Sequence, residues 1–62
     1  MPKAHEEISL LNEKLKIEED KFFLGNSAAG TRARKLLQEI KKVCQNGRDA
    51  IQKAKADDEQ GQ

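Results

Sequence analysis

Four basic side chains recur every seven residues in the second half of the chain, and we call them the basic row: Arg34, Lys41, Arg48 and Lys55. On an α-helix they would stand about 10.5 Å apart and span about 31 Å. Three further cations lie beside this row: Arg32, Lys35 and Lys42. A straight line of positive charge can follow a polyanion, because duplex phosphates repeat about every 3.4 Å along one strand.

This pattern predicts phosphate binding with little reading of bases. The segment 31–35 adds a hydroxyl and backbone amides near the positive end of a helix dipole, and Arg side chains bind phosphate in a forked geometry. The only aromatic residues, Phe22 and Phe23, precede this segment, so stacking on unpaired bases is not supported. We expect contacts to the duplex backbone from seven residues: Arg32, Arg34, Lys35, Lys41, Lys42, Arg48 and Lys55.

A second interpretation competes with phosphate binding. Basic residues beside an apolar helix face commonly pair with acids of a neighbouring helix. The first half of the chain holds a matching acidic row: Glu6, Glu13 and Asp20. Composition alone slightly favours such pairing, within the chain or between subunits. The protein would then be a helical interaction or oligomerisation module.

The elements that carry these residues are two predicted helices. Apolar residues recur at helical spacing over residues 4–24, in a wide arc that must meet more than one neighbour. The turn is expected at residues 25–27, because Gly25 can end a helix and Asn26 or Ser27 can cap the next. The second helix is expected over residues 27–56. A connection this short favours an antiparallel hairpin.

The second helix carries a predicted core row with alternating spacings of four and three: Ala33, Leu37, Ile40, Cys44, Gly47, Ile51 and Ala54. Cys44 is therefore expected to be a small buried hydrophobic residue. Asn46 and Gly47 could form a turn, but the heptad phase continues across them, which favours one continuous helix. Gly30 either admits a neighbouring group at close range or marks a delayed helix start.

Size and composition restrict the class of protein. The chain has 62 residues, of which 35% are hydrophobic and seven are Ala, so its core is small. Such chains need a disulfide, a metal or a partner. One Cys and one His make the first two unavailable within one chain, so we predict a homodimer that forms a four-helix bundle. We expect no cofactor, metal, small-molecule substrate or enzyme activity, since no catalytic or phosphate-loop motif is present.

The charge distribution is uneven although the net charge is only +1. Residues 1–24 hold four Lys and six acids (4 − 6 = −2), residues 25–56 hold eight cations and two acids (8 − 2 = +6), and residues 57–62 hold three acids (−3). We expect residues 1–56 to form the hairpin and the acidic tail 57–62 to be disordered. No apolar run could span a membrane, and one lone Cys suits the reducing cytoplasm.

The segment from Gly25 to Lys42, GNSAAGTRARKLLQEIKK, resembles the bacterial histone H1-like proteins, the family that includes the chlamydial nucleoid proteins. A helix ending in a Lys-Phe segment, here Lys21 and Phe22, is a further point of similarity, and the resemblance covers about residues 8–55. It implies a largely helical module and a non-enzymatic, DNA-binding, chromosome-organising role in the nucleoid. The matched positions imply DNA contacts at Arg32, Arg34, Lys35, Lys41 and Lys42. The better-known members carry a long Lys- and Ala-rich tail, where this chain has acids.

Overall fold

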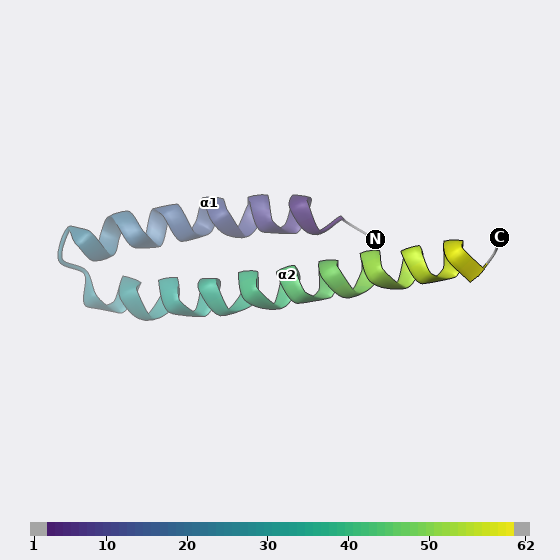
Figure 1. Ribbon diagram of the computed structural model, residues 1–62. Coiled ribbons are helices and arrows are strands. Elements are labelled where there is room, and N and C mark those ends of the chain that lie inside the picture. The colour runs from purple at the N-terminus through teal and green to yellow at the C-terminus, as the bar shows by residue number, and fades with distance from the viewer. Residues whose placement is uncertain (1–2, 61–62) are drawn as a thin grey trace.

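The protein is a rod made of two antiparallel α-helices. The computed structural model describes residues 3–60, with side chains for residues 3–57, and contains no strand in that range. α1 runs over Ala4–Phe23 and α2 over Ser27–Gln60. Figure 1 shows the two helices side by side, with the turn at one end and α2 extending past α1 at the other. The extents are 56 × 15 × 14 Å, and the predicted all-α antiparallel hairpin is confirmed.

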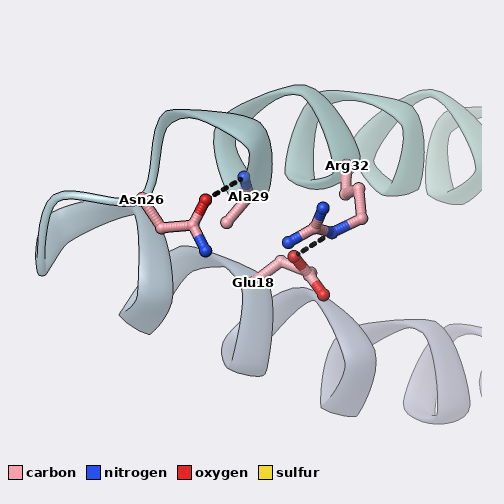
Figure 2. Close-up of polar contacts among 4 residues, drawn as sticks. All are labelled: Glu18, Asn26, Ala29 and Arg32. Atoms are coloured by element: carbon pink, nitrogen blue, oxygen red, sulfur yellow. Dashed lines mark hydrogen bonds and ion pairs between the residues drawn. The ribbon is translucent and has the colours of Figure 1, made fainter.

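The turn between the helices covers residues 24–26, and Gly25 and Asn26 determine its shape. Gly25 has φ of +110°, the left-handed region that glycine adopts without a steric penalty. Its N–H donates to the carbonyl of Phe22 and the N–H of Asn26 donates to that of Lys21, which is a Schellman ending for α1. The Asn26 side chain then accepts a hydrogen bond from the N–H of Ala29 at 3.2 Å and caps α2 (Figure 2).

The contact between the helices is a narrow seam with spacings of four and three on both sides. On α1 its side chains are the partly or fully buried residues Ala4, Ile8, Leu11, Leu15 and Glu18. On α2 they are Ala29, Ala33, Leu36, Ile40, Val43 and Gly47. Among residues 3–57, only Leu15, Ala29 and Ala33 are buried, so one hairpin has very little core of its own.

The predicted core row of α2 was partly wrong. Leu37, Cys44, Ile51 and Ala54 are exposed. Leu36 and Val43 take the seam places predicted for Leu37 and Cys44, whereas Ile51 and Ala54 lie beyond the start of α1. The apolar arc of α2 is three rows wide, and a single partner helix covers only two rows. Cys44 is therefore an exposed thiol in this hairpin and not a buried hydrophobic residue.

The glycines inside α2 allow close approach between the helices. A Cβ on Gly30 would lie 2.6 Å from the Phe22 ring, and a Cβ on Gly47 would lie 2.8 Å from the Cβ of Ala4. Gly30 therefore admits a neighbouring group, and it lies inside a helix that already begins at Ser27. The helix is continuous through Asn46 and Gly47, as the unbroken heptad phase indicated.

The last part of α2 projects beyond α1. Ala4 is level with Gly47, so residues 48–60 extend past the start of α1 by about 20 Å (Figure 1). The helix continues to Gln60, four residues beyond the end expected at residue 56. No glycine or proline interrupts residues 48–60, and Asp, Glu and Gln are tolerated in a helix. Residues 61 and 62 of the predicted tail lie outside the described part of the chain.

Candidate nucleic-acid interface

The seam sets the rotation of α2 and hence the direction of its charges. Because Ala33, Leu36 and Ile40 face α1, the basic row points to the outer side of α2. Lys35 and Lys42 form a second outward row, and a glutamine row lies between the two: Gln38, Gln45 and Gln52. These glutamines were not among the predicted DNA contacts, although their seven-residue spacing indicates a shared face.

Six of the seven predicted site residues are exposed and make no ion pair with any carboxylate among residues 3–57: Arg34, Lys35, Lys41, Lys42, Arg48 and Lys55. The exception is Arg32, whose Nε donates to Oε2 of Glu18 at 2.7 Å across the seam (Figure 2). The Glu18 side chain is largely covered, with 16% of its surface exposed, whereas that of Arg32 is 49% exposed. Arg32 of α2 is therefore bound to Glu18 of α1 and helps to hold the two helices together.

The acidic row lies on the opposite side of the rod. Glu6, Glu13 and Asp20 are exposed, and they project from α1 away from the seam. The hairpin thus carries its acidic row along one outer edge and its basic row along the other. Pairing of these two rows within one chain, which was one of the two interpretations, does not occur between the described residues.

The surface of α2 has shallow depressions that are lined mainly by polar and basic side chains. A depression is lined by the Thr31 hydroxyl, the Gln38 amide and three cations, Arg34, Lys35 and Lys41, with Leu37 at its edge. A second depression further along α2 is lined by Gln38, Lys41, Lys42 and Gln45. Hydroxyl, amide and cationic donors suit phosphate oxygens. One acid, Asp49, also lies on this face of α2. Its carboxylate accepts a hydrogen bond from the Gln45 amide at 2.9 Å.

Comparison with known families decides the relationship of the chain. The profile of the family described as histone H1-like protein Hc1 matches residues 3–57. The chain belongs to this histone H1-like family. No curated protein and no solved structure matches the chain.

Membership of the histone H1-like family indicates the general role of the protein. The family is one of non-enzymatic, DNA-binding proteins, and it suggests a location in the nucleoid. Within the described residues, neither helix of this family member is long and apolar enough to cross a bilayer. The described side chains also include no group of three potential metal ligands.

Proposed function

We propose that this histone H1-like protein binds double-stranded DNA through the phosphate backbone, using the outer face of α2. Contacts would come from the basic row together with Lys35 and Lys42, and Arg32 would contribute less because Glu18 holds it. The protein would help to organise or compact the chromosome in the bacterial cytoplasm. The observation that carries this proposal is that six outward cations stand on one helix face without a carboxylate partner among residues 3–57.

The electrostatics of the hairpin support duplex DNA as the partner. A cation that is already paired with a carboxylate would have to give up that carboxylate in order to bind a phosphate. An unpaired cation binds the phosphate directly and releases counterions from the DNA. The acidic row lies on the far edge, so it does not face the DNA at close range. Its repulsion of the DNA phosphates is further screened by salt.

The side chains of the face predict weak sequence preference. Lys and Arg at seven-residue spacing address phosphates, which are the same at every base pair. The glutamine row could touch base edges only if α2 entered a groove. No aromatic residue lies on this face, so single strands should not be preferred to duplex.

Self-association is the second part of the proposal. A hairpin that buries only three apolar residues among residues 3–57 and exposes Leu10, Leu24 and Ile51 needs a further apolar contact. We propose that the protein is at least a homodimer.

A salt-titrated binding assay tests DNA recognition. Fluorescence anisotropy with a 30-base-pair duplex of arbitrary sequence, beginning at 50 mM salt, should show binding that weakens steeply. With four to five phosphate contacts the slope of log Kobs against log salt is expected near about −4. The variant Lys41→Gln/Lys42→Gln should bind more weakly and reduce that slope by about 2.

The matched control removes the same charge from the other helix. Lys14→Gln/Lys16→Gln changes two exposed lysines of α1, so it lowers net charge equally without touching the outer face of α2. Its slope should stay close to that of the natural sequence. Equal losses in both variants would show that total charge matters and not this face. No binding at 50 mM salt would refute the proposal.

A further inference from the structure

Two apolar rows remain uncovered on the hairpin. The α1 apolar row consists of Leu10, Ile17 and Leu24, and the α2 apolar row consists of Leu37, Cys44 and Ile51. Both repeat every seven residues, and none of their side chains enters the seam. Leu24 is 89% exposed and Ile51 is 70% exposed. Large apolar side chains in continuous rows mark contact surfaces.

The two rows lie on different sides of the rod. Leu10 lines a depression with Lys42 and Asn46 on one side. On the other side, a depression brings Phe23 and Glu19 together with Gly30 and Arg34, at the start of the α2 apolar row. A single neighbour therefore cannot cover both rows of one hairpin by one flat contact.

The charges beside each row decide which rows can meet. The α1 apolar row is bordered by the acidic row, whereas the α2 apolar row is bordered by the basic row. Pairing two copies of the same row in the antiparallel manner of a symmetric bundle would set like charges face to face, which is unfavourable. Packing the α1 row of one copy on the α2 row of another sets acids opposite bases.

We propose that the hairpins associate through unlike surfaces, with the α1 apolar row of one copy seated on the α2 apolar row of the next. Six apolar residues meet at the centre of this contact. The acidic row of the first copy then lies along the basic row of the second. This inference rests on the self-association proposed above and does not depend on DNA binding.

The offsets of the charged residues fix the direction of the contact. On α1 the acids stand three residues after or four before each apolar residue, as Asp20 and Glu13 do around Ile17. On α2 the bases stand three before or four after, as Lys41 and Arg48 do around Cys44. These mirror-image offsets bring the charged rows to the same side only when the two helices run parallel. Ile17 then lies against Cys44 of the next copy, with Glu13 beside Lys41.

Such a contact does not close on itself. After a first contact, one copy keeps its α2 apolar row free and the other keeps its α1 apolar row free, so chains of hairpins can grow. The neighbour's acids also occupy cations of the basic row that would otherwise face DNA. Self-association and DNA binding should therefore oppose each other at the basic row.

Mixing two complementary variants tests the proposal by sedimentation velocity, without DNA. Leu10→Gln/Ile17→Gln removes the α1 surface and Leu37→Gln/Ile51→Gln removes the α2 surface, and Gln is a good helix former. Each variant alone should require at least about tenfold higher concentration to associate than the natural sequence. An equimolar mixture should form a species of two chains that grows no further, because one intact surface of each kind remains.

The opposite results are equally definite. If either variant alone associates like the natural sequence, the rows pair with their own kind and the proposal is wrong. A mixture that stays monomeric also overturns it. Circular dichroism of each sample covers the case in which a variant alone unfolds, since mixing should then restore helix; a mixture that remains unfolded counts against the proposal.

Disulfide formation gives an independent test of direction. In Ile17→Cys the new thiol and Cys44 lie about 15 Å apart along the rod, since Ala4 is level with Gly47 and Phe22 with Gly30. A disulfide between them must therefore join two copies. We expect oxidation to give a ladder of linked chains, whereas Ser9→Cys, exposed elsewhere on α1, should give none above background. Crosslinking mainly between two Cys44 thiols in the natural sequence would overturn the proposal.

A charge exchange tests the role of the flanking rows while leaving the apolar rows intact. Glu13→Lys or Lys41→Glu alone should weaken association about two- to fivefold, and the double exchange in one chain should restore much of it. Lys16→Glu makes the same charge change outside the contact and should have less effect than Lys41→Glu. Additive losses in the double exchange would show that these two side chains do not meet.

Discussion

The methyl group of Ala4 lies directly against the backbone of Gly47, so that a Cβ on residue 47 would be 2.8 Å from the Cβ of Ala4. Neither atom belongs to a flexible side chain, and one of the helices would have to move. This contact explains why a glycine stands in the middle of a 34-residue helix, where it costs about 1 kcal/mol relative to alanine.

The contact predicts a coupling between these two positions. Gly47→Ala alone should change the free energy of unfolding by less than about 0.5 kcal/mol, because better helix propensity is offset by displacement of the first turn of α1. With Ala4→Gly in the background, the same change should stabilise by about 1 kcal/mol. Denaturant unfolding at one fixed protein concentration measures the cycle. Strictly additive effects would show that the two helices do not touch at this level.

The Phe22 ring and Gly30 form a second close contact, near the turn. A Cβ on residue 30 would lie 2.6 Å from the ring, so the ring would have to move away. Phe22 is already 43% exposed, and this movement would remove much of the packing that it still has. Gly30→Ala should therefore destabilise the hairpin by about 1 kcal/mol despite better helix propensity. In a Phe22→Ala background the sign should reverse. Destabilisation of the same size in both backgrounds would contradict the contact.

The Asn26 cap predicts a loss of stability that leaves DNA contacts in place. Asn26→Ala removes the side-chain acceptor for the N–H of Ala29 and should cost about 1 kcal/mol of unfolding free energy. Asn26→Ser should keep most of the stability, because serine also caps helices well. Thermal unfolding followed by circular dichroism compares the two. No loss of stability in Asn26→Ala would mean that the hydrogen bond contributes nothing.

Arg32 and Lys41 should behave differently although both were predicted DNA contacts. Arg32→Gln breaks a partly exposed ion pair with Glu18, so we expect up to about 1 kcal/mol of lost stability and little change in the salt slope of DNA binding. Lys41→Gln should leave stability unchanged and reduce that slope by about 1. Unfolding curves and salt titrations of both variants measure this split. A reduction in slope of about 1 for Arg32→Gln would restore it to the DNA contacts.

Much of this protein follows from local sequence chemistry. Gly25 ends α1 and Asn26 caps the start of α2. Both were predictable because backbone conformation and capping depend on a few neighbouring residues. The seven-residue spacing alone places the four cations of the basic row on one face. The continuity of α2 through Gly47 was likewise readable from the unchanged heptad phase.

The rotation of the helices about their axes was decided only by tertiary packing. Three adjacent apolar rows of α2 are equivalent by hydrophobicity, and one partner helix can cover two. Leu36 and Val43 lie in the seam, and Leu37, Cys44 and Ile51 are exposed. Gly30 and Gly47 allow the helices to approach closely at the two ends of this seam. The same rotation turned the acidic and basic rows to opposite edges of the rod, a relation that spacing within one helix cannot specify, because it depends on contacts between residues far apart in the chain.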